Sequence, residues 1–220
     1  MSTVTLTAVD STIAFCDTTV PQPLIDAWSY TTTFAQAAAR AAGNTDPSSQ
    51  SYFDAMTKEL QDLAWNVTEA GKLNYSQQAN KISPAGIVSS ILNPYLTAQQ
   101  QAQLSGVLNG IQQPDVSISG FLDFFWKKAS TSASKTNMAM GPLTMVNNAS
   151  NITMIYYGFD FNASSWRSLF VESDSASLAV SAYNLEMNLN MAMYNSISGD
   201  LIAKLAGKEA DHIASTPNDL

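Results

Sequence analysis

A strict alternation of apolar and polar residues near the end of the chain constrains the fold more than any other feature. In residues 183–193 every odd position is apolar, and asparagine or glutamate fills the even positions from 184 to 190. Successive side chains of a β-strand point to opposite faces, so this pattern predicts one long strand with an apolar face. Leu178 and Val180 are apolar at even positions, and we expect a β-bulge near Ala182 to bring both sets to one face.

Further strands are predicted on both sides of turn-rich sequence. Candidate strands cover residues 137–146, 152–161 and 166–171, and the Asn- and Ser-rich segments between them are typical of turns. Val4, Leu6 and Ala8 also alternate, which predicts an N-terminal edge strand. Residues 136–203 include one basic residue, Arg167, and five acidic residues, so these strands carry very little charge.

The first half of the chain is predicted to be helical, because apolar residues recur there at intervals of three and four. The clearest helix runs from the turn at residues 46–49 to Gly71. Its apolar stripe consists of Phe53, Met56, Leu60, Leu63 and Val67. The other helices of this half are expected at residues 24–43, after Ser83, after Thr97 and at residues 118–128.

The predicted helices precede the predicted strands along the chain. This order favours an α+β fold in a single domain of residues 1–220. The N-terminal helical block, about residues 20–130, is expected to pack on one face of a C-terminal antiparallel sheet. This sheet has about four to five strands in residues 136–197, and a short helix follows at about residues 200–213. The other sheet face would carry Asn, Ser and Thr, so we expect another chain to cover it.

Composition excludes several classes of protein. With 10 Lys and Arg against 18 Asp and Glu, the net charge of -8 leaves no basic surface for nucleic acid. One cysteine, Cys16, excludes an intramolecular disulfide. The sequence has neither a secretory signal pattern nor an apolar run of about 18 residues. We therefore expect a protein that is cytoplasmic as synthesised, or released by a non-Sec route.

The sequence does not support catalysis. His212 lies beside Asp211, but no motif supplies a nucleophile, and a partly exposed terminal-helix histidine is the favoured interpretation. Cys16 follows Phe15 in an apolar stretch and is expected to be a small buried residue. No metal spacing, phosphate loop or dinucleotide motif occurs, so we expect no cofactor, no metal and no enzyme activity.

A glycosidase needs a pair of carboxylates on facing elements. The acids in or near the strands are Asp160, Glu172, Asp174 and Glu186. Glu186 is the most suggestive, since it lies among asparagines on one strand face, where partial burial could raise its pKa. The favoured interpretation is that this charge prevents aggregation of an otherwise uncharged strand.

The aromatic segment 121–126, followed by Lys127 and Lys128, fits either a lipid anchor or a core helix, and we favour the core. Tyr156 and Trp166 are candidates for stacking on a ligand. Neither interpretation identifies a substrate.

Two functions remain. Uncharged amphipathic strands of 9 to 11 residues are what a transmembrane β-strand requires, which favours a non-catalytic, membrane-active protein of pore-forming or toxin type acting as a homo-oligomer on a lipid membrane. The alternative is a self-assembling structural or inclusion-forming protein whose sheet faces pair with other copies. The predicted membrane or assembly surface consists of Ile155, Tyr157, Phe159, Tyr183, Leu185, Met187, Leu189, Met191 and Met193.

Overall fold

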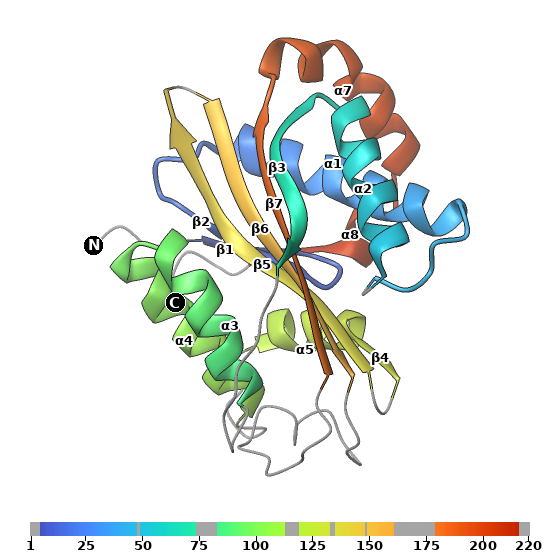
Figure 1. Cartoon of the computed structure of the whole chain (residues 1–220). Helices are drawn as coiled ribbons and strands as arrows, with labels where there is room; N and C mark the ends of the chain where they lie inside the picture. Colours follow the sequence, from blue (N-terminus) through green and yellow to red (C-terminus); the bar gives the residue numbers. More distant parts are fainter. Residues whose placement is uncertain are drawn as a thin grey trace.

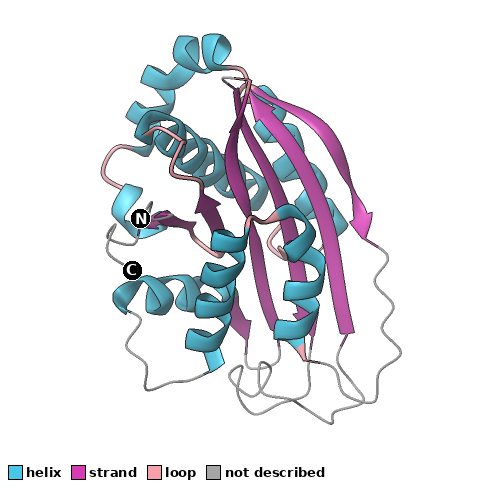
Figure 2. Ribbon diagram, turned by 90° about the vertical axis from the view of Figure 1, so that its left-hand side faces the viewer, coloured by secondary structure: helices cyan, strands magenta, loops and turns pink. Residues whose placement is uncertain are grey.

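The computed structural model places a β-sheet between two layers of helices (Figure 1, Figure 2). It describes residues 5–47, 49–73, 83–112, 119–132, 135–147, 149–160 and 179–215. Predicted positions outside these ranges are Val4, Phe161, the strand 166–171 with Trp166, Glu172, Asp174 and Leu178.

The sheet has the strand order β3-β7-β6-β5-β2-β1-β8, and β4 adds a short pairing to β5. All pairs are antiparallel except β2 with β5. Its strands are β1 (Thr5–Val9), β2 (Thr12–Cys16), β3 (Trp65–Leu73), β4 (Ser130–Ser132), β5 (Lys135–Val146), β6 (Ala149–Asp160), β7 (Ala179–Leu189) and β8 (Ile213–Ser215). A mixed α and β fold is therefore confirmed, but with more strands than the four to five expected.

One sheet face, here called face A, is covered by α1 (Gln22–Ala41), α2 (Gln50–Asp62) and α7 (Met191–Leu205). The opposite face, face B, is covered in part by α3 (Pro84–Leu92), α4 (Ala98–Gln112) and α5 (Ser119–Ala129). The short helices η1 (Asn93–Tyr95) and α8 (Glu209–His212) complete the fold. The prediction that helices cover a single face is wrong, because this chain supplies a helical layer for each.

Local capping signals place the middle helices correctly. The Ser83 hydroxyl accepts a hydrogen bond from the Gly86 amide at 3.2 Å, and proline occupies the first turn of α3. Thr97 and Gln100 form a reciprocal capping box at the start of α4. Phe121, Leu122 and Phe125 of α5 are buried, which confirms the core interpretation of the aromatic segment.

The helix predicted to reach Gly71 ends at Asp62, and Val67 lies in β3. The break is at Ala64, whose φ of 78° belongs to the left-handed region and cannot continue a helix. Trp65 then enters the sheet as the antiparallel partner of Leu189. The predicted apolar stripe was therefore correct up to Leu60, but its last member belongs to a strand and not to the helix.

The predicted strand 183–193 ends at Leu189, so Met191 and Met193 lie in α7 instead. Asn190 accepts a hydrogen bond from the Met193 amide at 3.1 Å and caps the helix. The terminal helix therefore begins at Met191 rather than near residue 200. Alternation continued past the boundary because a few helical residues can match a period of two by chance.

No bulge occurs near Ala182, because the β6–β7 register is continuous from Ala179 to Asn188. Val180 and Ala182 instead pack on the face B layer, while Tyr183 begins the apolar row on face A. The change of phase therefore marks a switch between two covered faces. The neighbouring β3–β7 pair does contain a bulge, but it lies in β3, between Val67 and Glu69.

The N-terminal strand is confirmed as β1, but β8 and β2 pair with its two sides, so it is not an edge. The sequence reading missed β2 because all five of its residues are buried and show no alternation.

Candidate functional site

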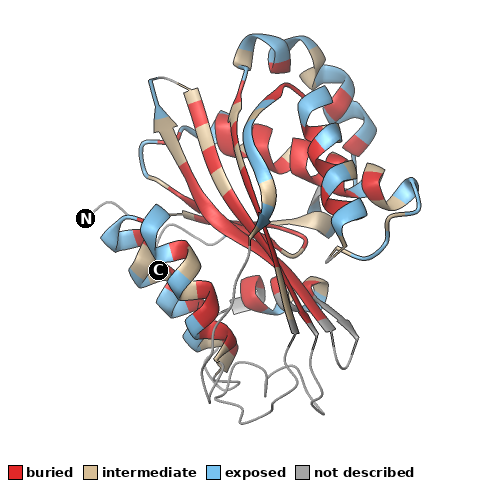
Figure 3. Ribbon diagram, in the orientation of Figure 1, coloured by how far each residue is buried: buried red, intermediate tan, exposed pale blue. Residues whose placement is uncertain are grey.

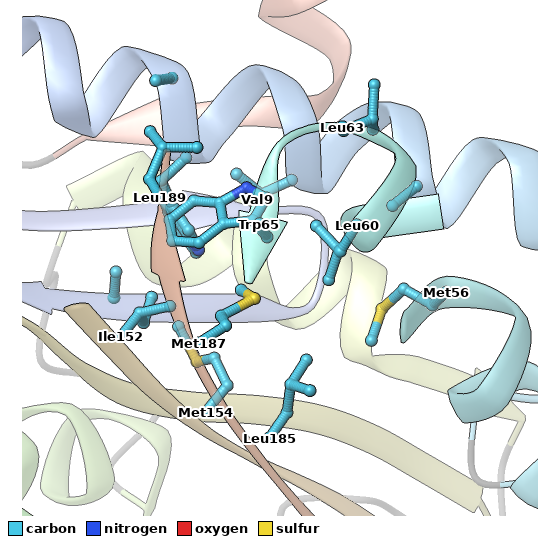
Figure 4. Close-up of a cluster of buried hydrophobic side chains, with 14 of the residues drawn as sticks. Val9, Met56, Leu60, Leu63, Trp65, Ile152, Met154, Leu185, Met187 and Leu189 are labelled. Carbon is cyan, nitrogen blue, oxygen red and sulfur yellow. The ribbon is translucent and has the colours of Figure 1, made fainter. Parts of the chain in front are cut away.

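Face A of the three long strands is apolar over much of its length, with Asn137 and Ser181 toward one end and Ser150 toward the other. The register places these side chains on it: Ala139, Leu143, Ile152, Met154, Tyr156, Tyr183, Leu185, Met187 and Leu189. All are buried in one hydrophobic cluster with side chains of α1, α2 and α7. Figure 4 shows Ile152, Met154, Leu185, Met187 and Leu189 around Trp65, with Met56 and Leu60 of α2 alongside.

Face B changes character along the same strands. One end is apolar, where Met138, Met140, Ile155, Tyr157, Phe159 and Ala182 pack in a second cluster with α3, α4 and α5. The other end carries polar, half-buried side chains, namely Thr144, Asn151, Thr153, Glu186 and Asn188. The burial colouring in Figure 3 follows this change, from red in the middle of the strands to tan at one end.

The structure divides the predicted membrane or assembly surface among three places. Tyr183, Leu185, Met187 and Leu189 are buried on face A, and Ile155, Tyr157 and Phe159 are buried on face B. Met191 and Met193 lie on α7, where Met193 is 44% exposed. A membrane or assembly role for the buried residues stays a prediction, and it requires the helical layers to separate from the sheet.

Tyr156, a predicted stacking residue, already has an aromatic neighbour. Its ring meets Phe53 of α2 edge-on at a centroid distance of 5.9 Å, and Phe53 stacks on Tyr183 at 5.0 Å. Burial raises the pKa of the Tyr156 hydroxyl. In this fold, Tyr156 therefore belongs to the contact between α2 and the sheet.

Helix α1 buries many small and polar side chains between the sheet and its neighbouring helices. The polar residues buried on α1 are Ser29, Thr31, Thr32, Thr33 and Gln36. Trp65 Nε1 donates to Thr31 Oγ1 at 2.8 Å, and Gln36 Nε2 donates to Thr12 Oγ1 at 2.9 Å. Within the described residues, four buried side-chain atoms of this helical layer lack a hydrogen-bond partner: Trp28 Nε1, Thr32 Oγ1 and Gln36 Oε1 on α1, and Thr57 Oγ1 on α2.

A polar clamp at the β1–β2 turn connects the two helical layers. Asp10 has a φ of 47°, and its side chain is 7% exposed. Its carboxylate accepts from Arg40 of α1 at 2.8 Å, and Lys128 of α5 lies 3.3 Å away. His212 Nδ1 lies 2.9 Å from Asp10 Oδ1, and the Asp10 amide donates to the His212 carbonyl at 2.8 Å.

Opposing effects set the charge state of Asp10. Burial alone would raise its pKa, but the hydrogen bond from His212 and the nearby charge of Arg40 outweigh it and lower the pKa of Asp10 below its usual value. Asp10 is therefore ionised at neutral pH and holds cations from both layers. The sequence reading missed this clamp, although Asp10-Ser11 between two apolar segments is a turn signal.

The clamp also accounts for His212. The sequence reading considered its neighbour Asp211 as the orienting carboxylate, whereas the structure supplies Asp10 from the other end of the chain. Within the described residues, no serine or cysteine forms a hydrogen bond with His212. Cys16 lies in β2, where burial raises the pKa of its thiol to about 12.

The described residues contain neither a cluster of metal-binding side chains nor a membrane-spanning helix. No three His, Cys, Asp or Glu side chains there lie close enough to share a metal ion. In the same ranges no helix has the length and apolarity needed to cross a bilayer.

Comparisons with known proteins give distant structural likeness. No protein-family model matches the chain, and no curated protein is significantly similar to it. The structure of the Evf virulence factor is similar over 88% of this chain and 78% of its own, with 10% identity and a TM-score of 0.41. The activated Cyt2Ba monomer from Bacillus thuringiensis subsp. israelensis is similar over 62% of this chain and 77% of its own, with 12% identity and a TM-score of 0.34. Both scores lie below 0.5, so the function of this chain has to rest on its own residues.

Proposed function

We propose that this protein is a non-catalytic, membrane-active protein that oligomerises and inserts β5, β6 and β7 into a lipid bilayer. The observation that carries this proposal is the apolar part of face A, which extends over residues 139–145 of β5, 152–156 of β6 and 183–189 of β7 and carries no charge there. In the soluble fold α1, α2 and α7 shield this face, and in the inserted state lipid would replace them.

Strand length and charge support insertion. β5 and β6 have 12 residues and β7 has 11, whereas a transmembrane strand needs about 9 to 11. The charged residues of these strands are Lys135 and Asp160, which are register partners at one end of β5 and β6 beyond the apolar part of face A, and Glu186 on face B. A pore-forming strand places a polar group such as Glu186 toward the water-filled interior and charged strand ends outside the apolar band.

The composition of the α1 layer supports separation of that layer from the sheet. Small and hydroxyl side chains bury less apolar area than leucine or isoleucine, so they stabilise the contact less. Each unpaired buried polar atom further destabilises the closed state by about 1–3 kcal/mol. Water would satisfy these atoms once α1 leaves the sheet.

The test is release of a quenched dye from liposomes, combined with two substitutions at neighbouring positions. Met145 and Thr144 are both half-buried on β5, but Met145 packs against the face A cluster and Thr144 lies on face B. An aspartate facing lipid near the interface is unfavourable by up to about 1 kcal/mol in each subunit. These penalties add over the subunits of an oligomer, so several subunits lower the inserted population by about tenfold or more. Met145→Asp should therefore abolish most dye release, while the matched control Thr144→Asp should retain it.

Both variants must show the wild-type circular dichroism spectrum for this comparison. Equal dye release by the two variants would refute lipid contact through face A. No release by the wild-type protein on any membrane tested would refute the proposed function.

Self-assembly is the second candidate, and the observation that favours it is the edge strand β3. β7 pairs with one side of this strand, while its other side has no strand partner in the described part of the chain. Exposed strand edges pair readily with other copies. Light scattering without lipid separates the two candidates, since large particles that release no dye favour assembly.

A further inference from the structure

Face B of the three strands proposed to insert carries one charge between the strand ends. The charged residues of β5, β6 and β7 are Lys135, Asp160 and Glu186. Lys135 and Asp160 are register partners at one end of the sheet, and their opposite charges cancel. Glu186 therefore gives the three strands a net negative charge.

Neutral polar side chains surround Glu186 on face B. Thr153 of β6 is its direct partner, and Asn188, the next residue on this face of β7, pairs with Asn151. Thr144 of β5 extends the row of Asn188 and Asn151. All five side chains are half-buried, so water already reaches them in the closed fold. Insertion with this part of face B toward water keeps that environment, whereas contact with lipid would remove the water from a carboxylate.

The lysine of these strands lies too far away to neutralise Glu186. Lys135 is level with Ala179 in the sheet register, and Ala179 is seven residues from Glu186 along β7. At about 3.3 Å per residue this separation is about 23 Å, more than two Debye lengths at physiological ionic strength. The carboxylate of Glu186 therefore determines the charge of its part of face B.

We propose that Glu186 lines the water-filled interior of the inserted oligomer and makes this pore selective for cations. This inference rests on the proposed function, because only an oligomer brings several copies of Glu186 into one ring. Rings of carboxylates favour the passage of cations over anions in protein channels.

The size of the expected effect follows from the electrostatic potential in the pore. A lining of one sign of charge produces potentials of at least about one kT. Such a potential concentrates monovalent cations and depletes monovalent anions, each by a factor of about 2.7, so the permeability ratio of cations to anions is about seven. Salt screens the charge, since the Debye length falls from about 10 Å at 0.1 M to about 3 Å at 1 M. The selectivity should therefore decrease in concentrated salt.

The experiment measures the reversal potential of channels formed by the full chain in a planar phosphatidylcholine bilayer, under a gradient of KCl around 0.1 M. The wild type should favour K⁺ over Cl⁻ by about sevenfold. Glu186→Gln should lower this ratio to about one, and Glu186→Lys should make the pore favour Cl⁻. Glu69→Gln is the matched control, because Glu69 is the exposed partner of Glu186 on β3, a strand that is not proposed to insert. This control should keep the wild-type ratio.

Dye release separates this inference from the proposed function. Glu186→Gln and Glu69→Gln should release at least as much dye as the wild type and show its circular dichroism spectrum, which excludes misfolding. A wild-type permeability ratio of about one, or a ratio that Glu186→Gln leaves unchanged, would overturn cation selectivity through Glu186 while the proposed function stands. An equal loss in Glu69→Gln would overturn the assignment of the pore charge to Glu186. Neither channels nor dye release by the wild type would overturn both.

Discussion

Replacing Asp10 by asparagine tests whether one buried carboxylate holds both helical layers on the sheet. Asparagine has nearly the same shape, and it tolerates the left-handed φ of 47° at this turn better than most residues do. The substitution therefore removes the charge with little change to the backbone. Arg40, Lys128 and His212 then lose their shared anion.

The expected loss of stability follows from the exposure of the partners. Removing one partner of a fully buried ion pair destabilises a protein by about 3–5 kcal/mol, because the other charge stays buried. Here the side chains of Arg40, Lys128 and His212 are 37%, 30% and 28% exposed, so water can solvate them after the substitution. We therefore expect a smaller loss of about 2–3 kcal/mol, which lowers the Tm by about 4–12 °C for a chain of this size.

The assay is urea unfolding followed by circular dichroism, with hydrogen exchange to locate the change. Exchange should increase at the C-terminal ends of α1 and α5, which the clamp joins through Arg40 and Lys128. Asp62→Asn is the matched control, since its ion pair with Lys58 is exposed and should not contribute measurably. A change below about 0.5 kcal/mol for Asp10→Asn, or one equal to that of the control, would refute the clamp.

Three further predictions concern the same fold. The stability difference between wild type and Asp10→Asn should persist from pH 7 to 5, begin to shrink below about 4, and vanish only below the lowered pKa of Asp10. The reason is that a carboxyl with a lowered pKa stabilises the fold above its unfolded pKa of about 3.9 and loses that effect on protonation. A difference that disappears at pH 5 in urea titrations would contradict this. Gly141→Ala should destabilise by about 3 kcal/mol in urea unfolding, since its Cβ would lie within 1.7 Å of the Thr153 carbonyl oxygen, whereas Gly199→Ala, with open space around it, should not destabilise. Cys16, with its pKa raised to about 12 by burial, should resist iodoacetamide at pH 8 in the folded protein and react in urea, as mass spectrometry would show; rapid labelling of the native chain would contradict its burial.

If face A contacts lipid, Asp10→Asn should also speed dye release. Release of the layers from the sheet precedes insertion, and the substitution removes an interaction that only the closed state makes. A stability loss without faster release would indicate that the clamp supports the fold but does not limit the opening step.

Part of the candidate site could be predicted from the sequence. The low charge of residues 136–203 and the alternation from Tyr183 to Leu189 correctly identified an apolar strand row. Both are local properties of the sequence. An apolar residue at every second position places all the apolar side chains on one strand face, which is more stable when buried. The same sequence pattern does not indicate whether helices, lipid or another copy of the chain buries that face, because each offers an apolar surface.

The errors at the helix and strand boundaries have a common cause. After Asp62 and again after Asn190, the apolar spacing continues although the backbone changes from one regular structure to another. The left-handed Ala64 and the capping Asn190 decide these boundaries, together with the pairing of Trp65 with Leu189. A short apolar pattern is compatible with both structures, so tertiary contacts select between them.

The sequence by itself determined which segments must bury an apolar row, where Ser83 and Thr97 begin helices, and that charge is scarce along the long strands. These features depend on neighbours within a few positions of the chain. Only the tertiary structure placed helices on both faces, joined Asp10 to His212, and set Glu69 opposite Glu186. Such pairs lie far apart in the sequence, and strand order and register bring them together, so no local pattern could have predicted them.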